Sequence, residues 1–189
     1  KILKLYHARN LAIEQASGKY ISFLDVDDTW EKEKMELQVN FLESNKDIKM
    51  VYSNFYLLDQ SKEEKISIYN NQLPSGRITG ELLKKYTIGI LTVCAHKKIF
   101  EKYFFEKKYN VIGDFDLFVK LSKYTNIEVI QEPMATYRVH GNNFSLLNED
   151  LTIKEFEHWI KKNKNFYKKA DLSELKISIR WLKIKNYFS

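Results

Sequence analysis

The chain of 189 residues is 44% hydrophobic and 14% aromatic, with two prolines and six glycines, a composition that favours one packed domain and excludes an intrinsically disordered chain. It contains no run of about 18 apolar residues, so the sequence predicts no membrane-spanning helix, and residues 1–5 lack the apolar stretch of a signal peptide. The formal net charge of +6 arises after residue 151, where ten Lys and Arg face four Asp and Glu, whereas the preceding residues are neutral.

Apolar residues follow helical and strand-like spacings in alternation along the chain. The expected helices are a first one that ends near Gly18, a second after residue 31 that carries Met35, Val39 and Leu42, and others over 79–86, 97–105 and 114–123. The expected strands cover 20–24, 48–58, 88–95 and 127–131, the last closed by Pro133, with a polar loop or hairpin over 59–76. Only helix is expected from residue 152 to 188, with a break near 170–171. This order predicts an α/β sheet of mostly parallel strands.

Three carboxylates stand together at Asp25, Asp27 and Asp28, directly after the expected strand 20–24. The carboxyl end of such a strand is where open α/β sheets bind their ligands. Carboxylates this close repel one another unless a cation lies between them. A divalent ion with oxygen ligands, Mg²⁺ or Mn²⁺, meets that need, usually with a phosphate on its far side. The alternative is a plain acidic turn in which Asp28 or Thr29 caps the next helix.

The segments around the acidic turn resemble the family-2 glycosyltransferases that have the GT-A fold. The resemblance rests on Ala-Arg-Asn at 8–10, Ala-Ser-Gly-Lys-Tyr-Ile at 16–21, Phe-Leu-Asp-Val-Asp-Asp at 23–28 and Trp30, and it continues over 50–54, 113–121 and 137–141. It implies a Rossmann-like nucleotide-diphospho-sugar transferase fold, an α/β architecture whose mixed sheet is flanked by helices. It also implies a hexosyltransferase-type enzyme that moves a sugar, with inversion, from a nucleoside-diphosphate donor to a hydroxyl of a saccharide or lipid-linked acceptor. The process implied is bacterial cell-surface polysaccharide or lipopolysaccharide synthesis.

The resemblance assigns roles to residues near the donor. Asp27 would hold the Mg²⁺ or Mn²⁺ ion that bridges the donor diphosphate, because a cation stabilises the charge of that leaving group. Asp25 would act through the ribose or a metal-bound water, and Asp28 would do either or cap the helix. Arg9 and Asn10 resemble positions that face the nucleotide, and the planar guanidinium of Arg9 suits a phosphate.

A second acidic pair, Asp114 and Asp116, stands at the start of the expected helix 114–123. An inverting transfer is one in-line displacement, which needs a carboxylate to take the proton of the acceptor hydroxyl. In the family this carboxylate lies in a Glu-Asp-x-Asp-Leu-type motif, and Asp114 aligns with it, whereas Gly113 replaces the Glu. Asp114 is therefore the expected base, and Asp116 is the second candidate, which is expected to help cap the helix. The alternative is that both acids are only helix caps.

Arg138 and His140 precede Gly141-Asn142-Asn143, a segment with the composition of a lid that closes over a donor. The resemblance places both residues at the donor, with His140 on the metal ion or a phosphate. The alternative for His140 is a plain loop histidine.

A competing resemblance concerns Asp25-Val26-Asp27-Asp28-Thr29, which also looks like the Asp-x-Asp-x-Thr signature of haloacid-dehalogenase-type phosphatases. In that family the first Asp is a nucleophile and the second a general acid. Two features disagree with it. The phosphatases usually carry a small residue at the place of Asp28, and they explain neither the Ala-Arg-Asn helix nor the Tyr-Arg-x-His segment at 137–140.

The start of the chain also bears on the resemblance. GT-A enzymes have a first βαβαβ section before the helix that matches residues 8–18, and no trace of it is found here. We therefore expect residues 1–150 to be a partial GT-A catalytic domain and residues 151–189 a basic helical tail. An inactive, truncated remnant that binds donor without turnover is a further alternative.

The tail is basic and amphipathic from residue 175 onward. Its apolar stripe consists of Ile177, Trp181, Ile184 and Phe188, with Lys176, Arg180 and Lys183 beside it. Such a helix suits an anionic membrane surface, and the alternative is a solvated face or packing on the body. No nucleic-acid motif is present, so nucleic acid is not an expected partner. Together with the single cysteine, Cys94, these features predict a cytoplasmic location, peripheral at the inner face of the membrane.

Overall fold

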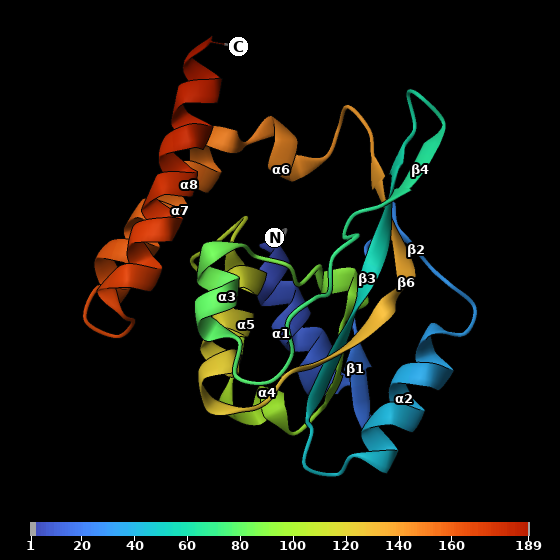
Figure 1. Cartoon of the computed structure of the whole chain (residues 1–189). Helices are drawn as coiled ribbons and strands as arrows, with labels where there is room; N and C mark the ends of the chain where they lie inside the picture. The colour runs from blue at the N-terminus through green and yellow to red at the C-terminus, as the bar shows by residue number, and fades with distance from the viewer. Residues whose placement is uncertain (1–2, 189) are drawn as a thin grey trace.

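The computed structural model describes residues 3–188, and the side chains of residues 3–182 (Figure 1). In chain order the elements are α1 (Leu5–Gln15), β1 (Tyr20–Ser22), β2 (Thr29–Trp30), α2 (Lys34–Ser44), β3 (Met50–Asp59), β4 (Glu64–Ser67), α3 (Thr79–Lys84), the 3₁₀ turn η1 (Ile90–Thr92), β5 (Cys94–His96), α4 (Ile99–Lys102), α5 (Gly113–Tyr124), β6 (Glu128–Val139), α6 (Phe144–Leu147), α7 (Glu149–Asn163) and α8 (Lys169–Phe188).

The six strands form one mixed sheet in the order β1-β5-β3-β6-β2, with β4 paired to β3 as a hairpin. Within the described part of the chain, β3 and β6 are the parallel pair, and the pairs β1–β5, β3–β5, β3–β4 and β2–β6 are antiparallel. The expectation of mostly parallel strands is therefore wrong, whereas the mixed sheet implied by the family resemblance is confirmed.

The sheet has a helical layer on each face. Side chains alternate across a strand, so Met50 and Tyr52 enter the large core beneath α1, α3 and α5, while Val51 points to the opposite face. There Val51 packs with Cys94 and with Leu42 of α2. Figure 1 shows α2 alone on its side of the sheet. The first half of the central strand β3, residues 50–54, is thus buried between the two layers.

Two expected strands differ from the structure. Pro133 does not close a strand, because β6 continues through it to Val139. Pro133 lies opposite Asn54, where the register of the β3–β6 pair shifts, and such an irregularity tolerates a residue without an N–H donor. The expected strand 88–95 is instead the turn η1 followed by the short β5.

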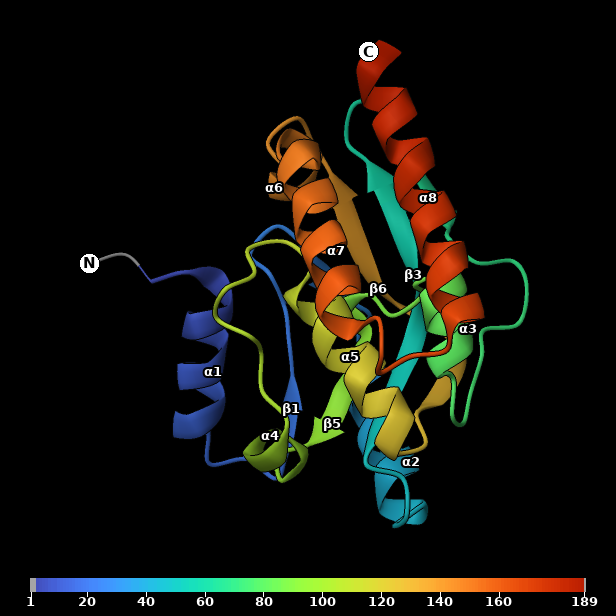
Figure 2. The ribbon, with the colours of Figure 1, turned by 90° about the vertical axis from the view of Figure 1, so that its left-hand side faces the viewer.

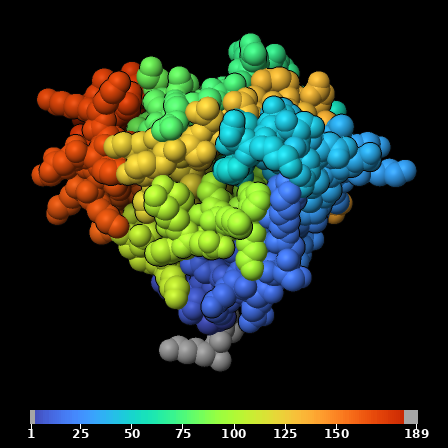
Figure 3. Space-filling model, turned by 90° about the horizontal axis from the view of Figure 1, so that it is seen from below, coloured from blue at the N-terminus to red at the C-terminus, as the bar shows by residue number. Residues whose placement is uncertain are grey.

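The segment after residue 150 packs on the body through an apolar seam. Trp159 of α7 is fully buried, and Leu175 and Ile179 of α8 join the same core. Figures 2 and 3 show these two helices along one side of the molecule. No helix within residues 3–188 is both long and apolar enough to cross a bilayer. The domain boundary at residue 150 stays a prediction.

Lys34 on α2 is fully buried, which is rare for an ammonium group. Its Nζ donates to Gln38 Oε1 at 2.7 Å and lies 4.4 Å from the ring centroid of Trp30. Gln38 in turn donates to the carbonyl oxygen of Thr92 at 2.7 Å. Burial lowers the pKa of Lys34 to about 8. This cluster ties α2 to Trp30 and to η1, and so supports the strand that follows the acidic turn.

Replacing Lys34 by Met should change how stability depends on pH. An unfolded lysine keeps its proton up to about pH 10.4, whereas folded Lys34 loses its proton near pH 8. The free energy of unfolding of the wild type should therefore rise between these values, by about 3 kcal/mol, and that rise should be absent in Lys34→Met. Urea unfolding at pH 7, 8.5 and 10 measures it, with the exposed Lys32→Met as the matched control. Parallel profiles for wild type and Lys34→Met would contradict the assignment.

Candidate active site

The acidic turn lies between β1 and β2, the strands at opposite ends of the sheet order, and its Asp28 contacts β6 near the end of that strand. The N–H of Asp28 donates to the carbonyl oxygen of Asp25 at 3.1 Å and closes the turn, and Val26 at its tip is fully exposed. The carboxylates of Asp25, Asp27 and Asp28 each have a different partner. They therefore do not converge on one point, as a cage of three carboxylates around one ion would require.

The first carboxylate is paired with a cation from α1. The guanidinium Nη2 of Arg9 lies 2.6 Å from Oδ1 and 2.9 Å from Oδ2 of Asp25. Arg9 is largely buried while Asp25 is more exposed, so the pair faces solvent through its carboxylate. The structure brings Arg9 to the acidic turn, and its expected contact with the nucleotide stays a prediction.

The second carboxylate meets the histidine that follows β6. His140 Nε2 and Asp27 Oδ2 are 3.0 Å apart, and both side chains are partly exposed. The N–H of Asn142 donates to His140 Nδ1 at 3.2 Å. Because Nδ1 accepts this bond, the neutral ring carries its proton on Nε2 and donates it to Asp27. The structure thus joins two residues that are 113 positions apart and that were predicted at the donor.

The third carboxylate, Asp28, is buried and tied to β6. Its Oδ1 accepts the backbone N–H of Arg138 at 3.0 Å. Burial raises the pKa of Asp28 to about 6; the charges of Asp27 and Asp25 add to this effect, and the Arg138 N–H opposes it. The capping alternative is wrong, because α2 begins at Lys34 without a side-chain cap.

Asn143 organises the loop behind this turn, although the sequence assigned it no contact of its own. Its Oδ1 accepts the N–H of His140 at 2.6 Å, and its Nδ2 donates to the carbonyl oxygen of Arg138 at 3.0 Å. The Nε of Arg138 is buried and has no hydrogen-bond partner within residues 3–182. The Asn in a Gly-Asn-Asn loop was the available sequence signal for this role.

Asn10 is engaged by the backbone at both ends of its side-chain amide. Its Nδ2 donates to the carbonyl oxygen of Phe105 at 2.8 Å, and its Oδ1 accepts the N–H of Phe105 at 3.0 Å. Both ends of the amide are engaged by one backbone unit, so this side chain anchors α1 to the segment after α4. The expected contact of Asn10 with the nucleotide stays a prediction.

Asp114 lies in the first turn of α5, with a tyrosine hydroxyl on each oxygen. Tyr6 is 3.2 Å from Oδ1 and Tyr86 is 3.3 Å from Oδ2. Burial raises the pKa of Asp114, against the N–H of Phe115 and the charge of Arg9, which lower it. A carboxylate with a raised pKa at a helix start is suited to accept a proton near neutral pH. Neither tyrosine carried a recognisable signal in the sequence.

Asp116, the second candidate, points into the core instead. It is buried, and its Oδ1 accepts the indole N–H of Trp159 at 2.7 Å. Burial raises the pKa of Asp116, and the Trp159 bond opposes that rise. Helix α5 has no side-chain cap, so Asp116 links α5 to α7 and does not cap the helix.

The donor set can be tested against a divalent cation. No group of three or more His, Cys, Asp or Glu side chains that could hold a metal exists in the part of the chain that the structure describes. Mg²⁺, however, keeps several waters and is often bound through one or two carboxylates plus substrate phosphates. The half-exposed Asp27 fits that pattern, whereas Asp25 is held by Arg9 and Asp28 is buried.

Solved structures share this fold. The crystal structure of Staphylococcus aureus TarS 1–349 aligns with a TM-score of 0.57 at 13% identity, covering 90% of this chain and 49% of that one. The GT-A fold expected from the sequence is confirmed.

Curated relatives agree with the fold. A Rickettsia bellii protein described as an uncharacterized glycosyltransferase is 29% identical over 141 residues, which are 75% of this chain and 20% of that protein. The Escherichia coli protein WfgD, named UDP-Glc:alpha-D-GlcNAc-diphosphoundecaprenol beta-1,3-glucosyltransferase, is 32% identical over 124 residues, 65% of this chain and 46% of WfgD. The chain thus spans less than half the length of either relative.

A family model settles the choice between the two families. The model described as "Glycosyltransferase like family 2" matches residues 3–175, which include the acidic turn, α5 and the loop after β6. The phosphatase alternative is set aside on this match. The chain belongs to glycosyltransferase family 2.

Proposed function

We propose that the protein carrying this chain is an inverting, metal-dependent glycosyltransferase that uses a nucleoside-diphosphate sugar in cell-surface polysaccharide synthesis. The observation that supports this most is the arrangement around α1, whose Arg9 reaches Asp25 of the acidic turn while its Tyr6 reaches Asp114. One helix thus joins a donor-side carboxylate cluster to a carboxylate suited to act as a base. The relatives WfgD and TuaG, the latter named for teichuronic acid biosynthesis, favour a surface polysaccharide as the product.

On the donor side, Asp27 is the residue proposed to hold Mg²⁺ or Mn²⁺. A bound cation of this kind supplies positive charge to the diphosphate as the glycosidic bond breaks. The Nε2–H of His140 is hydrogen-bonded to Asp27, and His140 is proposed to redirect this hydrogen bond to a phosphate oxygen of the donor. Asp25 and Asp28 are proposed to shape the turn, through Arg9 and the backbone of Arg138 respectively.

On the acceptor side, Asp114 is proposed to take the proton of the attacking hydroxyl. The hydroxyl oxygen then bonds to the anomeric carbon as the bond to the diphosphate breaks on the opposite face, which inverts that carbon. Burial raises the pKa of Asp114. As the pH is lowered, turnover should therefore be lost at a pH above the value of about 4 at which an ordinary Asp is protonated. The lipid-linked acceptor in the name of WfgD suggests a saccharide or lipid-linked acceptor here.

Asp27→Asn in the full chain should abolish the metal-dependent part of nucleotide binding, because the cation loses its carboxylate anchor. Calorimetry with UDP, GDP and dTDP, each with and without Mn²⁺, measures this, and wild type should bind at least one of them more tightly with the ion. Asp47→Asn, which removes an exposed charge, is the control and should bind as wild type. Metal-dependent affinity that survives in Asp27→Asn, or is absent from wild type, would overturn the assignment.

Asp114→Asn should lower kcat by about 10²–10⁴-fold, the usual contribution of a general base, while donor affinity stays near that of wild type. The matched variant is Asp116→Asn, which keeps an oxygen acceptor for Trp159 and should retain most of its turnover. Both are assayed with UDP-glucose and a diphosphoundecaprenol-linked GlcNAc, the substrates in the name of WfgD. Wild-type turnover in Asp114→Asn, with Asp116→Asn inactive, would assign the base to Asp116. A wild type that binds donor but never transfers sugar would support the inactive remnant.

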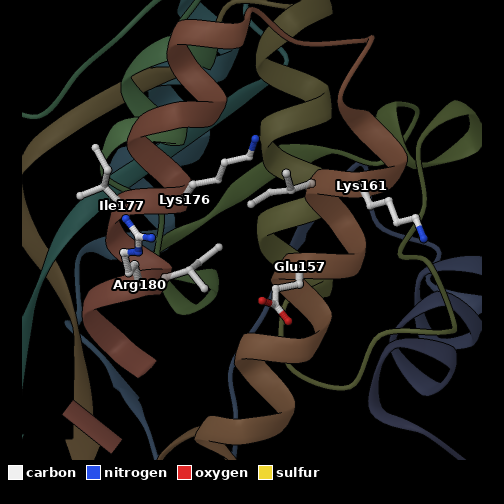
Figure 4. Close-up of a pocket in the computed structure, with 7 residues that line it drawn as sticks. Glu157, Lys161, Lys176, Ile177 and Arg180 are labelled. Atoms are coloured by element: carbon white, nitrogen blue, oxygen red, sulfur yellow. The ribbon is translucent and has the colours of Figure 1, made fainter. Parts of the chain in front are cut away.

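We also propose that α8 places the enzyme at the inner face of the membrane. Ile177 and Trp181 are 51% and 68% exposed, so this stripe does not pack on the body. Lys176 and Arg180 stand beside it, around a groove of about 540 Å³ between α7 and α8 (Figure 4). A basic, apolar surface of this kind suits anionic lipid. The side chains of the remaining stripe residues, Ile184 and Phe188, and of the neighbouring Lys183 lie outside the described residues.

Ile177→Ser combined with Trp181→Ser should weaken binding to phosphatidylglycerol vesicles, because the apolar contact is lost while the charges remain. Vesicle cosedimentation at low and high salt measures this, and salt should weaken the wild-type binding by screening. Ile66→Ser on β4, whose side chain is 46% exposed, is the control and should bind as wild type. Binding that is equal in the double variant, or equal on uncharged vesicles, would contradict a membrane role for α8.

A further inference from the structure

The space beside Gly113 is filled by the ring of Tyr6. A Cβ at position 113 would lie 2.5 Å from Cε2 and 2.6 Å from Cδ2 of Tyr6, far closer than nonbonded carbons approach. The ring cannot move aside easily, because Tyr6 is buried and stacks on Phe105 with centroids 5.3 Å apart. Gly113 does not have a positive φ. The glycine is therefore required by space and not by backbone conformation.

The packing of Tyr6 against Gly113 brings its hydroxyl to the start of α5. The hydroxyl lies 2.6 Å from the carbonyl oxygen of Val111 and 3.2 Å from Asp114 Oδ1, so its single proton is shared between these two acceptors. From the segment after α3, the hydroxyl of Tyr86 lies 3.3 Å from Oδ2 of the same carboxylate. Tyr86 is held by an edge contact between its ring and that of Phe115, with centroids 5.3 Å apart. Each oxygen of Asp114 is thus faced by a phenol from a different element.

We propose that Tyr6 and Tyr86 are positioning residues that hold the Asp114 carboxylate in one orientation, and that Gly113 is the position that admits Tyr6. The proposal rests on Asp114 being the base of the proposed function. A base must present one oxygen to the acceptor hydroxyl, and a side chain fixed by two donors loses little freedom on reaching that geometry.

The groups that face Asp114 determine the expected effect of removing a phenol. They are Tyr6 and Arg9 from α1 and Tyr86 from the segment after α3. Burial raises the pKa of both tyrosines, so each stays a hydrogen-bond donor at neutral pH. A donor to the carboxylate favours its ionised form. Loss of either hydroxyl should therefore raise the pKa of Asp114 and move the acidic limb of the kcat profile to higher pH.

The test compares Tyr6→Phe and Tyr86→Phe with Tyr109→Phe. Tyr109 is also buried, but its hydroxyl has no hydrogen-bond partner among the described residues. Titration of the Asp114 carboxyl carbon by NMR in the full chain should give a pKa raised by about one unit in each of the first two variants and unchanged in the control. Tyr6→Phe and Tyr86→Phe should also lower kcat at neutral pH about tenfold while the donor KM stays unchanged. Raising the pH should restore part of the lost kcat.

The titration separates this proposal from the function on which it rests. If Asp114→Asn keeps full turnover, the assignment of the base is wrong, and the titration still shows whether the phenols hold the carboxylate. If Asp114 titrates in Tyr6→Phe and Tyr86→Phe as it does in Tyr109→Phe, the positioning role is wrong even when Asp114→Asn is inactive.

A second pair of variants tests whether Gly113 leaves the space that the ring of Tyr6 fills. Gly113→Ala alone should lower the melting temperature, because its Cβ meets the Tyr6 ring. In a Tyr6→Ala background that obstacle is gone, so adding Gly113→Ala should lower the melting temperature much less. Losses that simply add, as expected for residues that do not touch, would overturn the assignment of Gly113 as the position that admits Tyr6.

Discussion

Carboxylates placed close together are stable only when each finds its own compensation, and this constraint organises the structure around the acidic turn. Asp25 has the guanidinium of Arg9, Asp27 has His140, and Asp28 has a backbone N–H of β6. The three partners come from α1, from the loop after β6 and from β6 itself. Compensating the charges therefore fastens three elements, far apart in the chain, to one turn.

The same logic extends from the turn to α5. Arg9 is near enough to Asp114 to lower the pKa of that carboxyl while it pairs with Asp25. The Arg9 guanidinium thus affects one carboxylate of the acidic turn and one of α5. Tyr6, one turn earlier on the same helix, adds a neutral donor to Asp114. A short stretch of α1 supplies both the charge and the hydrogen bond that a buried carboxylate needs.

Sequence periodicity predicted most helices and the central strand, because burial of a face is a local pattern. It missed what depends on distant partners. Pro133 ends a strand by local rules, but the register shift opposite Asn54 lets β6 continue. Residues 88–95 read as a strand because they are apolar, yet most of them line the core as a turn around η1.

For the site, the sequence predicted the residue types better than their contacts. Asp27, His140 and Asp114 stand in surroundings that suit the chemistry proposed for them. Asn10 and Asp116 carry the right groups, but the backbone of Phe105 and the indole of Trp159 engage them. Hydrogen-bond partners this far apart in sequence become visible only when the chain is folded. Likewise, the sequence alone did not explain why Gly113 stands where the family motif has Glu. In the fold, the ring of Tyr6 fills the space that a side chain at position 113 would need.

Strand β6 is bonded both to the acidic turn and to the loop that follows β6. It pairs with β2 at Thr29 and Thr136, its Arg138 N–H holds Asp28, and the Arg138 carbonyl holds Asn143. The turn and the loop are therefore both attached to β6. The hydrogen bonds that hold the turn and the loop reduce the conformational entropy that is lost when a ligand binds there. Association there should then be limited by diffusional encounter and orientation, and not by the ordering of a loop.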